Sequence, residues 1–430
     1  MADINKILDS FDNLLNKEVS LSGRMINIRK MKTGLFIDLM NKNDIIQLFF
    51  SSLDSNNLST GDLINIKGKC FYTKRGEPTI KIEELQIINK WNSDIGYKLV
   101  KNINKKTPLK IFLKEKYIRC YTSYRIREHI RDFLKNNNFM EVYTPVLCEK
   151  YNGGRSFPVK SICNNNMIGY NRATMEEKMQ ALVGSGFERI FQIGNVFRSL
   201  NEFISVEGYA ANVNWNDGQM MIRELLQYVI KEIDKEIDIP ANKTIENIKN
   251  NNWQLIDFVE GAVEIYGKKI LKPLSDGVLL SKYLVENKII KNKSILPETA
   301  GDIIAKEILK KQDKPTLING FPLWNSPLYL PCDNDNRIAC IQRSKVYFPG
   351  LLDGGFDMGV QENNYKRFLE RIEKQRKNWS LQSDDSRVQE SELETILSCG
   401  MPPMFGFGFL EPDRITRIWR EDCTIDPFEK

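Results

Sequence analysis

Five short segments of strand length follow one another within the first 90 residues of the chain. Apolar residues alternate or cluster in each segment, which is the pattern of strands that bury one face. Turns at Gly34 and Gly76 separate neighbouring segments. The five segments are residues 18–27, 35–39, 44–51, 62–73 and 78–88. Short strands joined by tight turns predict a small closed barrel at the start of the chain.

A five-stranded barrel of this size is the pattern of an OB-fold. The face of such a barrel commonly binds single-stranded nucleic acid through aromatic stacking and hydrogen bonds to base edges. A barrel with a purely structural role is the alternative that the pattern leaves open. We expect residues 1–100 to form this domain.

The rest of the chain mixes helices and strands without a regular alternation. Helical periodicity marks residues 121–136, 218–237, 364–379 and 385–397. Strand-like segments are residues 189–198, 205–214, 315–318, 337–342 and 404–409. This order predicts an α+β core on a mixed, mostly antiparallel sheet flanked by helices, and neither GxxxxGK[ST] nor GxGxxG appears at a strand-to-helix turn.

The expected domains are joined by a basic stretch. Residues 101–125 carry eight Lys or Arg against one acid, Glu115, which fits either a linker that faces a polyanion or a plain solvated face. We expect residues 101–120 to be a linker and residues 121–430 to form the second domain. Residues 240–313 are uneven and Lys-rich, and their pattern predicts no clear element.

Composition excludes several kinds of site. The single histidine, His129, lies in an amphipathic stretch, whereas serine triads need a histidine base and histidine-ligated metal sites need several. The eight cysteines form no CxxC pair, so a zinc knuckle has no support. The net charge of +6 permits a polyanionic partner without indicating one. Without a membrane-length apolar run or a signal-peptide layout, we expect a cytoplasmic protein with no membrane partner.

A long motif occupies residues 186–198, which read Gly-Phe-Glu-Arg-Ile-Phe-Gln-Ile-Gly-Asn-Val-Phe-Arg. It resembles the second motif of class II aminoacyl-tRNA synthetases in its lysine-specific form, and residues 202–217 follow the next strand of that family. Residues 140–145 resemble its first motif, and residues 402–414 its third. The resemblance covers nearly the whole chain and is weakest between about 240 and 313. It implies a class II core, a tRNA anticodon-binding OB-fold and, because class II cores pair through the first motif, a homodimer.

The resemblance extends to the barrel. Four of its side chains fall on the positions that read the anticodon in the lysine family: Arg29, Phe36, Gln47 and Glu77. An aromatic ring can stack an unpaired base, an amide can pair with a uracil edge, and a carboxylate can accept from an imide N–H. Each residue alone is more simply explained as structural or solvated, but the four together favour anticodon binding. The implied partner is a lysine-type tRNA with a UUU anticodon.

A lysine pocket is also implied by the resemblance. Glu176 falls on the position that meets the α-ammonium, and Arg198 on the position that meets the carboxylate and the ATP α-phosphate. Tyr209 falls on a position for the ε-amine, as does Asp353, where the family has Glu. Further lining positions are Glu207 and Gly154. Because a side-chain ammonium needs a desolvated carboxylate for selectivity, an acid at residue 353 indicates lysine or a close analogue.

For ATP, the resemblance places Phe203 against the adenine and Arg414 on the phosphates, together with Arg198. Adenylate formation depends mostly on positioning and electrostatic stabilisation, so the two arginines are the candidate catalytic residues.

At three places in the sequence, the residues expected to bind ATP or its metal ion differ from those of the family. About eight residues of the nucleotide-gripping loop are missing between Arg198 and Glu202. The two acidic Mg²⁺ ligands of the family fall on Ala339 and Val346, which cannot bind a hard cation, so no metal site is predicted and the need for Mg²⁺ is doubtful. A proline also enters the third motif, where the family has a compact glycine turn.

Three functional hypotheses follow. The chain is an active ligase that adenylates lysine or an analogue, with metal contacts supplied by other groups such as Asp353 or Asp357. Alternatively, it is a binding or regulatory homologue that keeps the barrel and the pocket without adenylation. In the third hypothesis it receives a lysyl group already on tRNA, for transfer or hydrolysis without ATP.

Overall fold

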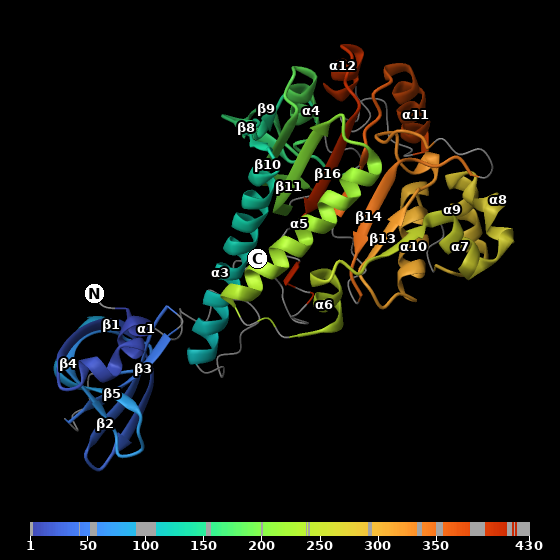
Figure 1. The fold of residues 1–430 in the computed structure, drawn as a ribbon. Helices are drawn as coiled ribbons and strands as arrows, with labels where there is room; N and C mark the ends of the chain where they lie inside the picture. The colour runs from blue at the N-terminus through green and yellow to red at the C-terminus, as the bar shows by residue number, and fades with distance from the viewer. Residues whose placement is uncertain are drawn as a thin grey trace. The chain divides into compact units, whose positions relative to one another are not determined.

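The computed structural model describes residues 3–42, 44–51, 58–91, 109–151, 156–198, 201–237, 239, 241–290, 295–332, 338–349, 356–378, 392–410, 415–416 and 418. The described chain divides into two compact units between Ser123 and Tyr124 (Figure 1). No helix of the described chain is long and apolar enough to cross a membrane.

The first unit is a closed five-stranded barrel of the OB type, as predicted. A short helix, α1 (Ile4–Asp9), and a 3-10 turn (Phe11–Leu14) precede it. The strands are β1 (Glu18–Met31), β2 (Gly34–Asn41), β3 (Asp44–Phe50), β4 (Leu63–Tyr72) and β5 (Pro78–Asn89), paired in the order β1-β2-β3-β5-β4. A bulge at Lys67 and Gly68 helps β4 to bend around β5, and a Cβ at Gly68 would lie 2.2 Å from the Lys81 carbonyl oxygen.

Strict alternation decides which side chains of the barrel point outward. Leu35, Ile37 and Leu39 are fully buried in its core, as is Leu48. Successive residues of a strand point to opposite faces. Phe36 alternates with the buried Leu35 and Ile37, so it lies on the outer surface of the barrel.

The second unit is built on an eight-stranded sheet in the order β12-β13-β14-β15-β16-β11-β10-β6. The strands are β6 (Met140–Glu141), β10 (Arg189–Arg198), β11 (Asn201–Ala211), β12 (Gln254–Asp257), β13 (Thr316–Asn319), β14 (Arg343–Tyr347), β15 (Phe356–Val360) and β16 (Met404–Leu410). Only the β6/β10 and β12/β13 pairs are parallel, which confirms the predicted mixed, mostly antiparallel sheet. A smaller sheet contains β7 (Leu147–Cys148), β8 (Lys160–Cys163) and β9 (Asn166–Asn171).

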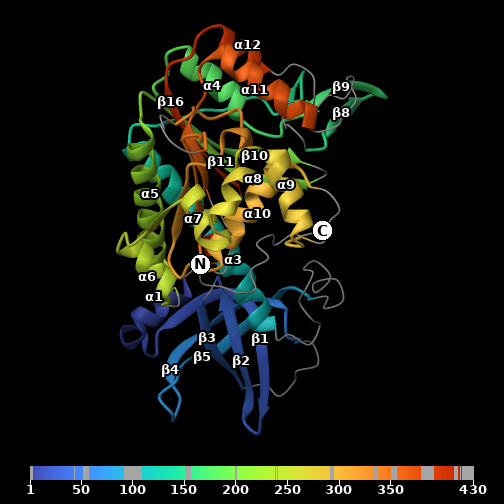
Figure 2. The ribbon, with the colours of Figure 1, turned by 90° about the vertical axis from the view of Figure 1, so that its right-hand side faces the viewer.

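Helices flank the large sheet (Figures 1 and 2). They are α3 (Leu109–Asn136), α4 (Glu176–Gly184), α5 (Trp215–Glu236), α6 (Lys243–Lys249), α7 (Phe258–Tyr266), α8 (Leu271–Leu274), α9 (Gly277–Glu286), α10 (Pro297–Leu309), α11 (Tyr365–Asn378) and α12 (Glu392–Ser398). The Asn214 side chain caps α5 by accepting from the Asp217 backbone N–H at 3.0 Å. Figure 1 shows α5 crossing the sheet, where its buried Ile222, Leu226 and Ile233 form one stripe.

The two faces of the central strands have different contents. On one face, Val206, Phe356 and Phe405 pack with α5 in the main hydrophobic core. The opposite face, which we call the pocket face, carries the alternate residues of β10, β11, β14, β15 and β16. Because the side chains alternate in this way, the candidate site described below lies on the pocket face.

Two expectations for the core require correction. The segment 337–342 is not a strand, since its described part makes only isolated bridges at Cys340 and Ile341, and the strand β14 begins at Arg343. The helix expected at 121–136 begins earlier, at Leu109, so residues 109–120 of the expected linker are helical, and residues 101–108 lie outside the described chain. The unassigned region 240–313 contains β12 and five helices in its described part.

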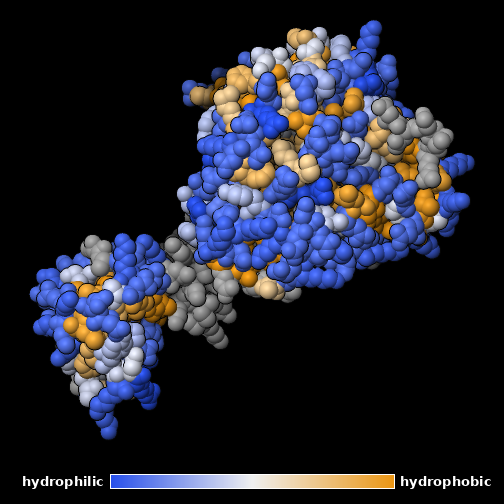
Figure 3. Space-filling view, viewed as in Figure 1, coloured by the Kyte–Doolittle hydropathy of each residue, from blue (hydrophilic) through white to orange (hydrophobic). Residues whose placement is uncertain are grey.

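Large apolar side chains are exposed around the segment that resembles the first motif. Tyr143 is 78% exposed and Val146 45% exposed. Phe157 and Ile162, which lie close in sequence to β8 or within it, are 64% and 66% exposed. Figure 3 shows apolar residues on the surface near α4, β8 and β9.

Candidate functional site

A cavity of about 200 Å³ opens on the pocket face of the large sheet. Its polar lining comes from α4, β10, β11, β14 and β15, and comprises Glu176, Arg198, Glu207, Tyr209, Arg343 and Asp357. The volume is below the roughly 300–1,000 Å³ of drug-sized ligand sites, which suits one small polar molecule.

Two glycines of β16 form part of the cavity floor. Gly406 and Gly408 alternate with Phe405, Phe407 and Phe409, whose rings enter the main core. A Cβ at Gly406 would lie 2.6 Å from both the Tyr209 ring and the Gln361 amide. The strand therefore presents bare backbone to the cavity, and a ligand can approach it closely.

Two carboxylates, the buried Glu207 and the partly buried Glu176, line one part of the cavity. The Thr174 hydroxyl donates to Glu207 at 3.1 Å and the Met175 backbone N–H donates at 3.3 Å. Burial raises the pKa of Glu207, although Arg198 opposes that shift. Burial, with repulsion from Glu207, raises the pKa of Glu176 to about 8.

Glu176 therefore needs a cation. Its Oε1 accepts from the Gln180 amide at 3.0 Å, but within the described residues no Lys or Arg makes an ion pair with it. A carboxylate desolvated in this way ionises at neutral pH only when a positive charge comes close. This arrangement can hold an ammonium group of a ligand.

Arg198 supplies positive charge near the same carboxylates. Its Nε donates to the Ala173 carbonyl oxygen at 2.8 Å, and its guanidinium carbon lies 5.8 Å from the Phe203 ring centre. Phe203 shares the pocket face because it alternates with Ser205, Glu207 and Tyr209 on β11. The cavity thus has a cation beside its two acids, and an aromatic ring lies next to that cation.

An ion pair closes another part of the cavity. Arg343 Nε donates to Asp357 Oδ1 at 2.8 Å, and Arg343 Nη2 donates to Asp357 Oδ2. The Tyr329 hydroxyl also donates to Asp357 Oδ1 at 3.0 Å. Although burial opposes ionisation, Arg343 lowers the pKa of Asp357 below its usual value.

The structure brings together four of the expected pocket residues: Glu176, Arg198, Glu207 and Tyr209. Phe203 lies next to Arg198 on the same face. Three other expected residues, Gly154, Asp353 and Arg414, lie outside the described residues.

Sequence reasoning missed several lining residues. They are Arg343, Tyr329, Gln361, Thr174 and Ser205. The sequence suggests Asp357 only as a substitute metal contact, but its carboxylate accepts hydrogen bonds from Arg343. The alternation of side chains along β14 and β15 puts Arg343 and Asp357 on one face, but the sequence does not predict these two strands at their actual positions.

The expected metal positions do not line the cavity. Val346 is fully buried on the α5 side of β14, opposite the pocket face, and Ala339 lies before that strand. The β14 side chains that share the pocket face are Arg343, Lys345 and Tyr347, and of these only Arg343 lines the cavity. Within the described ranges no group of three His, Cys, Asp or Glu side chains could hold a metal ion. Neither of the two expected positions therefore offers Mg²⁺ an oxygen ligand from its side chain.

The shortened loop of the second motif is also visible in the strand register. Arg198 pairs with Asn201 across β10 and β11, so only residues 199 and 200 join the two strands. A connection of this length leaves no chain for additional nucleotide-gripping side chains.

The barrel residues expected to read an anticodon all face outward or lie in a surface turn. Arg29 pairs with Phe36 across β1 and β2, and it forms a 3.0 Å ion pair with Asp38. The Phe36 ring lies 5.0 Å from the Phe49 ring. The amide oxygen of Gln47 accepts from Thr79 at 3.0 Å, and the exposed Glu77 precedes β5 by one residue.

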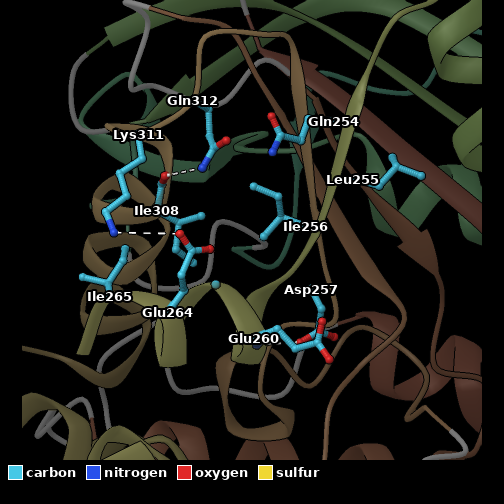
Figure 4. A pocket seen from close by; sticks show the side chains of 11 residues that line it. Gln254, Leu255, Ile256, Asp257, Glu260, Glu264, Ile265, Ile308, Lys311 and Gln312 are labelled. Atoms are coloured by element: carbon cyan, nitrogen blue, oxygen red, sulfur yellow. Dashed lines mark hydrogen bonds and ion pairs between the residues drawn. The ribbon is translucent and has the colours of Figure 1, made fainter. Parts of the chain in front are cut away.

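A second cavity of about 300 Å³ lies beside the sheet edge formed by β12, between α7 and α10 (Figure 4). Lys311 and Glu264 form an ion pair at 4.0 Å, and Figure 4 shows their side chains facing each other. None of the expected site residues lines this cavity, so we do not assign the reaction to it.

Comparisons with known proteins agree with this arrangement. Residues 106–425 match the family "tRNA synthetases class II (D, K and N)", and residues 19–88 match "OB-fold nucleic acid binding domain". The chain is 27% identical to "Probable lysine--tRNA ligase, cytoplasmic" of Enterocytozoon bieneusi, with 91% of this chain and 83% of that protein covered. It is 26% identical to "Lysine--tRNA ligase 2" of Methanosarcina mazei (97% and 85% covered) and 27% identical to "Lysine--tRNA ligase" of Buchnera aphidicola (98% and 87% covered). The family match spans well over half of the sequence, and the chain therefore belongs to the class II tRNA synthetases of the D, K and N group, as a lysyl-tRNA synthetase-like protein.

Proposed function

We propose that the chain activates an α-amino acid with ATP and attaches it to tRNA, and that lysine is the amino acid which the named relatives indicate. The observation that carries this proposal is the meeting of Glu176, Glu207 and Arg198 in one small cavity. An α-amino acid brings an ammonium and a carboxylate on one carbon, and the cavity offers buried acids beside an arginine for those two charges.

Each expected residue receives a role on this basis. Glu176, supported by Glu207, binds the α-ammonium, and Arg198 binds the carboxylate and then the α-phosphate as charge develops there. Phe203 stacks the adenine, and Tyr209 contacts the amino-acid side chain. Arg414 on the phosphates, with Asp353 and Gly154 around the side chain, remain expectations from the family resemblance. The family implies ATP as a substrate.

The barrel is proposed to bind the anticodon of a lysine-type tRNA with the sequence UUU. Phe36 would stack one base, and Arg29, Gln47 and Glu77 would contact base edges or phosphates. The match of residues 19–88 to nucleic-acid-binding OB-folds supports this assignment.

We further propose a homodimer that works in the cytoplasm. Exposed apolar side chains around the first motif, including Tyr143 and Val146, support pairing of two copies through that segment. The printed name of the Enterocytozoon bieneusi relative places that protein in the cytoplasm.

Lysine-dependent exchange of pyrophosphate into ATP tests the activation step. We expect exchange that requires Arg198, so that Arg198→Ala lowers it at least a hundredfold because the carboxylate and the α-phosphate lose their cation. Arg189→Ala is the matched control, since Arg189 lies on the same strand and donates to the Asn137 carbonyl oxygen, away from the cavity. A folded wild-type protein without exchange, over a range of Mg²⁺ concentrations, would exclude adenylation.

A second candidate function has its own supporting observations. The two-residue β10–β11 connection and the core position of Val346 favour a homologue that binds an amino acid and tRNA without adenylation. Such a protein would bind lysine and tRNA but give no exchange. Release of lysine from preformed lysyl-tRNA without ATP would identify the transfer or hydrolysis variant of this candidate.

A further inference from the structure

The strand β12 lies at the end of the large sheet. In the described chain it pairs only with β13, so its other edge has no partner strand there. The Gln254 backbone N–H donates to the Pro315 carbonyl oxygen at 2.9 Å, which is the start of the β13 side. Because the backbone groups of successive residues point to opposite edges of a strand, the N–H and the carbonyl of Leu255 point to the open edge.

The second cavity follows this open edge (Figure 4). All four residues of β12 line it, although their side chains alternate between the two faces of the sheet. Figure 4 shows Ile256 directed into the cavity and Leu255 directed away from it. Leu255 therefore lines the cavity through its backbone, while its side chain is 55% exposed on the opposite face. An extended segment laid along β12 would meet the cavity on one face and this leucine on the other.

The cavity lining is acidic, although the whole chain carries a net charge of +6. The helix α7 places Glu260 and Glu264 one turn apart on the same face, and Asp257 caps the helix. The only cation among the lining residues is Lys311, which meets Glu264 at 4.0 Å, and both side chains are more than half exposed. An exposed pair of this kind contributes about 0–1 kcal/mol, so an incoming cation can replace it. The cavity therefore suits a positively charged group.

We propose that β12 and this cavity form a docking site for an extended segment of a partner protein in which basic and apolar side chains alternate. The segment extends the sheet by one strand through hydrogen bonds to the Leu255 backbone. Its Lys or Arg side chains enter the acidic cavity, and the apolar side chain between them covers Leu255. A nucleic acid would bring phosphates against the carboxylates, and a second copy of this edge would bring like charges together. The two cavities share no lining residue, so this site is independent of the proposed function.

The probe is an amidated pentapeptide with the sequence Thr-Lys-Val-Lys-Thr and a fluorophore at its N-terminus. Its binding to the full-length protein is followed by fluorescence anisotropy. With the valine opposite Leu255, both lysines point to the cavity face, and we expect saturable binding with a dissociation constant below about 1 mM. The matched probe Thr-Glu-Val-Glu-Thr should bind at least about tenfold more weakly. N-methylation of the valine should have an effect of the same size, because it removes the N–H that the Leu255 carbonyl would accept.

Two changes to the protein test the acidic cavity and the open edge separately. The double variant Glu260→Gln with Glu264→Gln should weaken binding of the lysine probe at least about tenfold and leave pyrophosphate exchange unchanged. Glu246→Gln with Glu286→Gln is the matched control, since these exposed acids lie on α6 and α9 and do not line the cavity. Leu255→Pro removes an N–H that β13 does not use, so the protein should fold but bind the lysine probe at least about tenfold more weakly.

Several results would overturn the proposal. Absence of saturable binding of the lysine probe is one, and equal binding of the lysine and glutamate probes is another. Unchanged binding after N-methylation, or competition by spermidine at the concentration of the peptide, would show that the cavity takes a small cation and not an added strand. Unchanged binding in Glu260→Gln with Glu264→Gln would place the probe elsewhere on the protein.

Self-association of the wild-type protein that Leu255→Pro abolishes, as seen by sedimentation, would make a second copy of the chain the occupant and would also reject the proposal. Should Leu255→Pro fail to fold, the N-methylated probe still tests the open edge with the wild-type protein.

Discussion

Binding of an amino acid in the cavity is expected to release a proton from Glu176 at neutral pH. Burial, together with repulsion from Glu207 and Glu177, raises the pKa of Glu176 to about 8. At pH 7, about nine tenths of the molecules therefore carry a proton on this carboxyl group. An α-ammonium requires the ionised form, so binding at pH 7 includes the cost of removing the proton.

The magnitude follows from the distance between pH and pKa. One pH unit below the pKa, deprotonation costs about 1.4 kcal/mol, which weakens binding about tenfold relative to pH values well above 8. Between pH 7.0 and 8.5 the affinity for lysine should therefore rise roughly eightfold. Proton release should fall from nearly one per ligand at pH 7.0 to about a quarter at pH 8.5.

Calorimetric titrations of the full-length protein in phosphate and in Tris measure this release, because the two buffers differ in ionisation enthalpy. In Glu176→Gln the heat of any remaining binding should no longer depend on the buffer. Glu188→Gln is the matched control, since Glu188 is an exposed acid of the same unit that does not line the cavity. Wild-type binding with buffer-independent heat and constant affinity from pH 7.0 to 8.5 would refute the reasoning.

Three further predictions concern stability and the barrel. Because the folded-state pKa of Glu176 is raised to about 8, its contribution to stability is present below pH 4.5 and is lost as pH rises through 8. Glu176→Gln should therefore raise the unfolding free energy at pH 8.5, by up to about 5 kcal/mol, and leave it nearly unchanged at pH 4, as denaturant titration would show. Gly359→Ala should lower the unfolding free energy by about 2 kcal/mol or more, because its Cβ would lie 2.0 Å from the Gln342 carbonyl oxygen; an unaltered denaturation midpoint would contradict this. Phe36→Ala should weaken binding of a UUU anticodon stem-loop by about 1–3 kcal/mol in a fluorescence titration, whereas Tyr72→Ala, on a ring packed against Phe11, should not.

Much of the barrel and of β10–β11 could be predicted from the sequence, because their strands are local hairpins with clear alternation. Residues 189–198 were placed correctly as β10, and period two then puts Arg198 and Glu207 on defined faces. The outward direction of Phe36 and Gln47 follows from the same alternation on β2 and β3.

Less local features could not be predicted. The helices α7 to α10 are short, and Gly267 and Pro273 interrupt their periodicity, so residues 240–313 gave no clear pattern. The sequence predicts a strand at 337–342, six residues before β14 begins. The predicted strand therefore does not include Arg343, and the sequence does not place this residue on the pocket face. The hydrogen bond between Arg343 and Asp357 joins two residues 14 positions apart on neighbouring strands, and only the register of β14 and β15 brings these side chains together.

The two glycines of β16 in the cavity floor differ in how well they would tolerate a larger side chain. An added methyl group at Gly406 would strike Tyr209 and Gln361 at 2.6 Å, so the fold itself requires glycine there. At Gly408 the nearest atom to such a methyl group is the Glu207 Cγ at 3.8 Å, an ordinary contact. A larger residue at 408 would leave the protein folded and occupy the space of the ligand. Substitutions that alter what the cavity holds are therefore expected to be tolerated at Gly408 and not at Gly406.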